Sequence, residues 1–144
     1  MKKNYQIKHN QSGFSLIELL LVVVIIGVIA AIAVPSLMRA RQSAENASAY
    51  ASMRSLSTLQ VRYYSQNNRF AKLNELLEDQ QGNLGTYADG ALIKGPFSFV
   101  MEPGLTDDQL KREYKIIATR PGFGTTPPYV IELNQSGVIT EVVE

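Results

Sequence analysis

The hydrophobic pattern divides the chain into one continuous apolar run, one long helical stretch and a region of short alternating segments. The apolar run covers 14–34, where only Ser15 and Glu18 carry polar side chains. At 1.5 Å per helical residue, roughly 21 residues reach about 31 Å, which matches the hydrocarbon thickness of a bilayer. The pattern therefore predicts a helix over 14–35 that can span a membrane.

The next stretch, 36–67, contains neither Gly nor Pro, which predicts that the helix continues for about 30 residues. A stripe at helical spacing begins with small residues and ends with larger apolar ones. We expect its second half to pack on the protein's own sheet. For its first half, contact with another chain is an equal alternative. The stripe consists of Ala40, Ala44, Ala47, Ala51, Leu56, Leu59 and Tyr63.

The C-terminal part is predicted to be a loop over 68–96 followed by a sheet over 97–143. Within the loop, Phe70 to Asp79 predicts a short helix, and Thr106 or Asp107 is the expected N-cap of a helical turn between strands. Alternation of apolar and polar residues predicts four strands, at Phe97–Met101, Tyr114–Thr119, Tyr129–Leu133 and Val138–Val143. Asn134 to Gly137 should form a hairpin turn between the last two strands.

Together these elements predict an α+β fold. A long N-terminal helix, half of it in the membrane, packs on a small antiparallel sheet of three or four strands.

The charges of the chain are unevenly distributed. Residues 1–13 contain Lys2, Lys3 and Lys8 and no acid, which leaves 11 basic against 13 acidic residues in the remainder. Because positive flanks stay cytoplasmic, 1–13 should lie in the cytoplasm and 36–144 outside it. The slightly acidic remainder argues against a strong nucleic-acid partner, which would need a clustered positive surface.

The composition leaves little room for catalysis. The chain has no cysteine, so disulfides, thiol nucleophiles and cysteine metal sites are excluded. Its single histidine is His9, within 1–13, so no imidazole remains in the rest of the chain. We therefore expect no catalytic residue, no metal ligand set and no enzymatic activity.

Glu18 is the residue of the apolar run that demands an explanation. A carboxylate near the centre of a membrane helix costs on the order of 2.5 to 3.5 kcal/mol on insertion scales, and less near an interface. No Lys or Arg lies between Lys8 and Arg39, so the helix offers no counter-charge. Cleavage between Gly13 and Phe14 would create an α-amino group that a staggered neighbouring chain could present to Glu18.

Other interpretations of the apolar run stay open on these residues alone. Ala31-Ile32-Ala33 has the pattern of a secretory cleavage site, which would release a soluble binding domain. An uncleaved signal anchor is a second alternative. A membrane-anchored enzyme that uses a pair of carboxylates is a third, although no pair stands out from the scattered surface acids.

The segment Gly13-Phe14-Ser15-Leu16-Ile17-Glu18-Leu19, with Gly27 and Pro35 further along, resembles the prepilin signature of bacterial type IV pilins and type II secretion pseudopilins. The resemblance implies that a prepilin peptidase removes the leader 1–13 after Gly13. It implies N-methylation of Phe14 and a role for Glu18 as acceptor of a neighbour's amine during filament assembly. It also implies that the helix can bend or melt near Gly27 and Pro35.

The resemblance further implies a structural subunit of a type IV pilus or pilus-like filament. Its partners would be identical or homologous pilin subunits, the prepilin peptidase and the assembly machinery of the inner membrane. The chain would start as a single-pass precursor in the bacterial inner membrane and end in an extracellular pilus or a periplasmic pseudopilus.

The main alternative within this resemblance is a pseudopilin of type II secretion. The Asp-Pro-Trp-Gly type of motif associated with the major pseudopilin is missing, because the chain has no Trp, and this favours a pilin. No cofactor is expected, with one qualification drawn from pseudopilins that bind calcium near the sheet. The nearby carboxylates here are Asp107, Asp108, Glu102 and Asp89.

Overall fold

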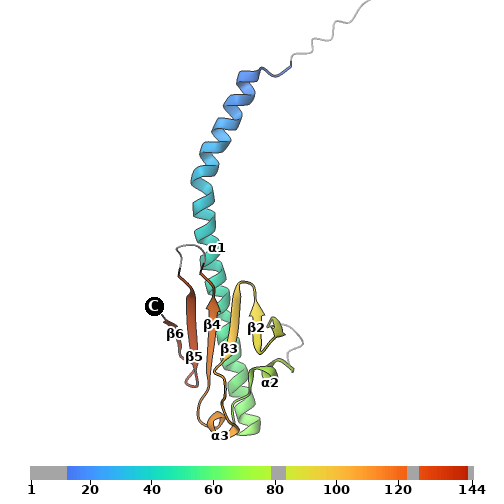
Figure 1. Ribbon diagram of the computed structural model, residues 1–144, viewed down its shortest axis with the longest axis vertical. Helices are drawn as coiled ribbons and strands as arrows, with labels where there is room; N and C mark the ends of the chain where they lie inside the picture. The colour runs from blue at the N-terminus through green and yellow to red at the C-terminus, as the bar shows by residue number, and fades with distance from the viewer. Residues whose placement is uncertain (1–12, 79–83, 123–126, 143–144) are drawn as a thin grey trace, which may run out of the picture. The chain divides into compact units, whose positions relative to one another are not determined.

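The computed structural model describes residues 13–78, 84–122 and 127–142, which form one long helix, two short helices and six strands (Figure 1). The chain divides into two compact units with the boundary between Arg41 and Gln42. The helices are α1 (Leu16–Asn67), α2 (Leu73–Glu78) and α3 (Asp107–Leu110), and the strands are β1 (Thr86–Ala88), β2 (Ala91–Lys94), β3 (Phe97–Met101), β4 (Lys115–Arg120), β5 (Tyr129–Asn134) and β6 (Ile139–Val142).

The two predicted helical stretches form a single helix. α1 runs without interruption from Leu16 to Asn67 and passes through Gly27 and Pro35. Proline lacks an N–H, so the carbonyl of Ala31 loses its usual partner at this point. The helix on both sides continues through this one missing hydrogen bond.

The second unit contains a sheet in which each strand pairs with the next along the chain. All five pairings are antiparallel, and the strand order is β1-β2-β3-β4-β5-β6. The expectation of three or four strands was therefore wrong, because β1 and β2 lie within 68–96, which we expected to be loop apart from one short helix. The four predicted strands and the predicted short helix, now α2, are all present, with ends that differ by a few residues at most.

Two tight turns explain the additional strands. Asp89 and Gly90 both have positive φ, 50° and 82°, which is the geometry of a type I′ turn, and they join β1 to β2 in the register Ala88↔Ala91. Gly95 has φ 57° and joins β2 to β3 ahead of Pro96. Asp-Gly and Gly-Pro are turn signals. The sequence therefore indicates both turns, although we predicted a loop over this region.

The core of the second unit lies between the sheet and the part of α1 after residue 41. Phe97 and Phe99 are buried and Met101 is partly buried, which confirms the predicted alternation in β3. Leu110 of α3 and Leu76 of α2 join the same cluster. The remaining buried apolar residues of the cluster are Ala49, Met53, Leu56, Ala71, Leu73, Leu84, Leu92, Tyr114, Ile116, Ala118, Ile131 and Leu133.

The second half of the predicted stripe packs on the core of the second unit, and its first half does not. Leu56 is buried and Leu59 and Tyr63 are partly buried, as expected, but Ala47 and Ala51 are exposed. The helix instead buries Ala49, Ser52, Met53, Leu56 and Gln60. Small residues fit either face of a helix, so their spacing alone did not settle which face meets the sheet.

Two predicted local features are confirmed. Asn134 and Gly137 bound the hairpin turn between β5 and β6, with the Asn134 side-chain oxygen accepting hydrogen bonds from two backbone amides of the turn and Gly137 at φ 75°. Thr106 is the N-cap of α3, where it forms a reciprocal capping box with Gln109.

Candidate assembly segment and cleavage junction

The predicted cleavage junction lies in open backbone. Gly13, Phe14 and Ser15 precede the first helical residue, Leu16, and the Phe14 side chain is 88% exposed. No helical hydrogen bond has to break before a protease can take this backbone, a situation typical of accessible cleavage sites. Residues 1–12 of the predicted leader lie outside the described residues.

Glu18 lies in the first turn of α1 and takes part in a reciprocal pair of hydrogen bonds with Ser15. The Ser15 backbone N–H donates to Glu18 Oε2 over 2.8 Å, and the Glu18 backbone N–H donates to Ser15 Oγ over 3.2 Å. This arrangement is a capping box, which satisfies two amides that a helix N-terminus otherwise leaves without partners.

The capping box changes the interpretation of Glu18. We expected the carboxylate to depend on a cation from elsewhere, because no basic residue lies nearby in the sequence. The structure adds a neutral donor from the same chain, the Ser15 amide. A neutral amide lowers the cost of placing the carboxylate near lipid but leaves its charge uncompensated. The Ser-x-x-Glu signature of a capping box is present in the sequence, although we did not predict the box from it.

The helix that follows is apolar on every side. The large apolar side chains from Leu16 to Met38 keep between 53% and 80% of their area exposed. α1 is also the one helix among the described residues that is long and apolar enough to cross a membrane. An apolar surface of this extent indicates contact with lipid or with other protein chains, because water disfavours it.

Gly27 and Pro35 lie inside α1 without ending it. A Cβ added at Gly27 would meet nothing within 4 Å, so no contact within the chain requires glycine there. Bending or melting of this stretch when subunits pack together therefore stays a prediction. This prediction concerns the helix when it is packed among other subunits, and the structure describes the isolated chain.

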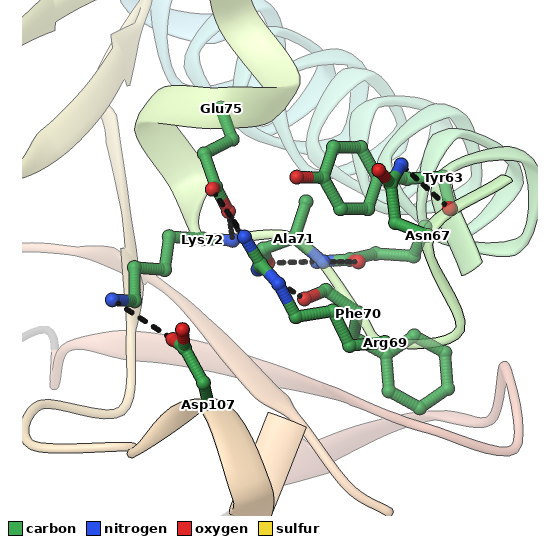
Figure 2. A network of polar contacts seen from close by, with 9 residues as sticks. Tyr63, Asn67, Arg69, Phe70, Ala71, Lys72, Glu75 and Asp107 are labelled. Carbon is green, nitrogen blue, oxygen red and sulfur yellow. Dashed lines mark hydrogen bonds and ion pairs between the residues drawn. The ribbon is translucent and has the colours of Figure 1, made fainter. Parts of the chain in front are cut away.

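A network of polar contacts lies where α1 ends (Figure 2). Arg69 forms two parallel hydrogen bonds with the Glu75 carboxylate, of 2.9 and 2.6 Å, and the Lys72 backbone N–H donates to the same carboxylate over 2.7 Å. The guanidinium also stands over the Tyr63 ring at 5.4 Å. The hydrogen bonds from Arg69 are the main cause that lowers the pKa of Glu75 to about 2.

This network joins the end of α1 to the segments that follow it. The Gln60 side chain, fully buried, donates to the Ala71 carbonyl over 2.9 Å and accepts from the Ala71 amide over 2.8 Å. Lys72 pairs with Asp107 at the start of α3 over 3.3 Å. The charged groups here are engaged with one another, which is the behaviour of a structural anchor rather than of a reactive site.

A second cluster joins α1 to the strands β3, β4 and β5. The Arg120 guanidinium lies 5.9 Å from the centre of the Phe97 ring and 5.6 Å from that of Tyr129, and it reaches Glu45 of α1 at 3.8 Å. Tyr129 donates to Glu141 of β6 over 3.2 Å. Burial is the main cause that raises the pKa of Tyr129. This cluster was not predicted from the sequence, because its members are far apart along the chain.

The carboxylates considered for calcium are distributed over separate places. Asp107 pairs with Lys72, and Asp108 pairs with Lys111 over 2.7 Å. Asp89 lies in the β1–β2 turn, and Glu102 follows β3. Within 13–78, 84–122 and 127–142, no group of three or more His, Asp or Glu side chains is arranged to hold a metal ion.

Comparison with known proteins finds a motif match in the N-terminal segment and similarity over part of the chain. Residues 8–34 match the family model described as the prokaryotic N-terminal methylation motif. The chain is 36% identical over 73 residues to the type IV major pilin protein PilA of Myxococcus xanthus, which is 49% of this chain and 33% of that protein. It is 34% identical over 94 residues to the type II secretion system core protein G of Aeromonas hydrophila, which is 60% of this chain and 65% of that protein.

The chain thus spans less than two thirds of the length of these curated relatives. The matched range contains the junction and assembly residues predicted from the sequence, including Gly13, Phe14, Glu18 and Gly27. The fold agrees with the resemblance, since a long N-terminal helix packs on an antiparallel sheet. The chain therefore carries the prokaryotic N-terminal methylation motif, and over part of its length it is similar to a type IV major pilin and to core protein G of type II secretion systems.

Proposed function

We propose that this protein is a structural subunit of a type IV pilus or pilus-like filament, processed by prepilin peptidase after Gly13 and N-methylated at Phe14. The observation that carries the proposal is one carboxylate, Glu18, in the first turn of a helix whose apolar surface is exposed from Leu16 to Met38. The cleavage junction lies directly before that turn. A single segment thus holds the cleavage position, the charge and the apolar surface that assembly requires.

Cleavage supplies the cation that Glu18 lacks. Hydrolysis of the Gly13–Phe14 bond leaves a carboxylate on the leader and an ammonium group on Phe14, and methylation of that amine retains its positive charge. Within one chain the new charge lies at the end of the helix. A neighbour shifted along the helix axis brings its own Phe14 ammonium to Glu18, and an ion pair surrounded by apolar side chains is stronger than one in water.

Repetition of this contact produces a filament. A contact between different surfaces of identical chains does not close on itself when each step combines rotation with translation, so it propagates as a helix. Each added subunit removes apolar area of its N-terminal helix from lipid or water. Burial relative to water contributes roughly 25 cal/mol per Å², so the helices form the stable centre of the shaft.

The proposal includes a location and a set of partners, which the resemblance to prepilins implies. The precursor crosses the bacterial inner membrane once, with 1–13 in the cytoplasm and the domain 36–144 on the other side, and it leaves the membrane when it enters a pilus. The partners are further copies or homologous pilin subunits, the prepilin peptidase and the inner-membrane assembly machinery. No catalytic residue and no cofactor are part of this proposal.

A second candidate is a pseudopilin of a type II secretion system, assembled in the periplasm by the same chemistry. It is supported by relatives named as core protein G from Aeromonas hydrophila and from Pectobacterium carotovorum, 34% identical over 94 and 70 residues. The absence of Trp, and with it of the Asp-Pro-Trp-Gly type of motif, favours a pilin.

The test is the mature N-terminus, determined by mass spectrometry on protein from sheared surface filaments and from the membrane fraction. A chain that begins with methylated Phe14 in surface filaments supports the pilin proposal. The same N-terminus found in a periplasmic assembly, with secretion lost on deletion, supports the pseudopilin instead. A chain that begins at Val34 overturns both, because it lacks Glu18 and the apolar helix, and leaves a soluble secreted domain.

A further inference from the structure

The Ser15–Glu18 capping box affects the axial register between neighbouring subunits. This inference rests on the proposed function. A free glutamate side chain has three rotatable bonds, and its carboxylate could meet an incoming amine at several heights along the helix. In this structure the Ser15 amide engages Glu18 Oε2 over 2.8 Å. The carboxylate is thereby held back toward the helix N-terminus before any neighbour arrives.

We propose that Ser15 is a positioning residue, which fixes the Glu18 carboxylate in the first turn and so sets the axial stagger between neighbouring subunits. With Oε2 occupied by the Ser15 amide, Oε1 is the oxygen that the box offers to the Phe14 ammonium of a neighbour. The hydroxyl of Ser15 holds residue 15 in this conformation, because it accepts a hydrogen bond from the Glu18 amide over 3.2 Å and so keeps the Ser15 N–H directed at Oε2.

Two physical effects make this positioning matter. Ordering a long side chain during association lowers affinity, so a carboxylate that is already fixed binds the amine more tightly. The positive end of the helix dipole also favours a carboxylate in the first turn. Ser15 contributes to the first effect, because it helps to hold the carboxylate in place without touching the incoming amine.

The position of Glu18 in the box also shows how to separate its two roles. Glutamine serves as well as glutamate in the last position of a capping box, because its side-chain oxygen accepts the same amide hydrogen. Glu18→Gln therefore keeps the box and removes the charge, whereas Ser15→Ala keeps the charge and removes the hydroxyl. Ser15→Thr keeps both and is the matched control.

The experiment expresses the full chain and its Ser15→Ala, Ser15→Thr and Glu18→Gln variants, and measures filament yield relative to the processed fraction found by mass spectrometry. Because the chain has no cysteine, register is measured by co-expression of Leu16→Cys chains with chains that carry one cysteine at successive positions from 20 to 30. The position of the disulfide cross-links then reports the stagger. Ser15→Gly replaces Ser15→Ala should the latter escape cleavage.

We expect Ser15→Ala to be processed, to yield roughly fivefold fewer filaments, the order of magnitude for loss of one N-cap hydroxyl, and to spread its cross-links over several positions. Ser15→Thr should restore yield and a single dominant cross-link. Normal yield and register for Ser15→Ala, with no filaments from Glu18→Gln, would overturn the positioning role and leave the proposed function standing. Normal filaments from Glu18→Gln would instead remove the charge from the assembly mechanism, and this inference with it.

Discussion

The two units of the chain use the same kinds of apolar residue with opposite results. In the unit before residue 42, apolar side chains stay more than half exposed; Leu21, for example, keeps 55% of its area. In the unit after it, Leu56 of the same helix is completely buried. The difference follows from the pattern, because apolar residues on all sides of a helix cannot be covered by one sheet, whereas one apolar face can. The second unit completes its fold within the chain, and the first requires lipid or other chains.

The largest test of this comparison removes the first unit. A chain of residues 42–144 should be soluble and monomeric and should unfold cooperatively, because its core cluster lies entirely after residue 41. It should be absent from membranes and filaments. Circular dichroism during denaturation and size-exclusion chromatography measure the first two properties. Loss of cooperative unfolding would show that the domain depends on the apolar segment.

Two identical substitutions at two places in α1 make the comparison quantitative. Leu56→Ala should lower the free energy of unfolding of the domain by about 2 to 5 kcal/mol, the range for a buried leucine that leaves a cavity. Leu21→Ala should leave that free energy within about 0.5 kcal/mol of the unmodified chain, because Leu21 keeps 55% of its area exposed. Denaturant titration of both variants in the same detergent measures the difference. Equal losses would contradict the division into two units.

Lowering the pH should destabilise the second unit, because the network at the end of α1 depends on the ionised carboxylate of Glu75. Hydrogen bonds from Arg69 hold the pKa of Glu75 at about 2, below its ordinary value of 4.5. The stabilisation is present in full above the unfolded-state pKa and is lost as pH falls from about 5 toward 2. With the carboxylate partly exposed, we expect a loss of about 1 to 3 kcal/mol.

Glu75→Gln should be less stable than the unmodified domain at pH 7 and should lose less stability between pH 5 and pH 2. Thermal unfolding at a series of pH values measures both. Glu78→Gln, on the same short helix, controls for the loss of one carboxylate. Parallel curves for Glu75→Gln and the unmodified domain would show that the Arg69 pair contributes nothing.

The helices, four of the strands and the N-terminal methylation motif could be predicted from the sequence, because each depends on local periodicity or on a short motif. The β1–β2 hairpin was missed although Asp89-Gly90 is a turn signal, because β1 has only three residues and no buried face to produce alternation. The Arg120 cluster could not be predicted. It joins Glu45, Phe97 and Tyr129, which come together only once the sheet is formed.

The smallest expected effect concerns two capping boxes, one in each unit. Thr106 and Gln109 form at the start of α3 the same reciprocal arrangement that Ser15 and Glu18 form at the start of α1, with 2.9 Å from the Thr106 amide to the Gln109 side-chain oxygen. Thr106→Ala should lower the free energy of unfolding of the domain by about 1 kcal/mol, because it leaves a helix amide without its partner. It should leave filament yield unchanged, whereas Ser15→Ala should lower the yield and leave domain stability unchanged. Thermal unfolding and filament yield, both measured on both variants, test whether each substitution affects only one of the two properties. A loss of filaments from Thr106→Ala would mean that α3 belongs to the subunit interface as well as to the domain.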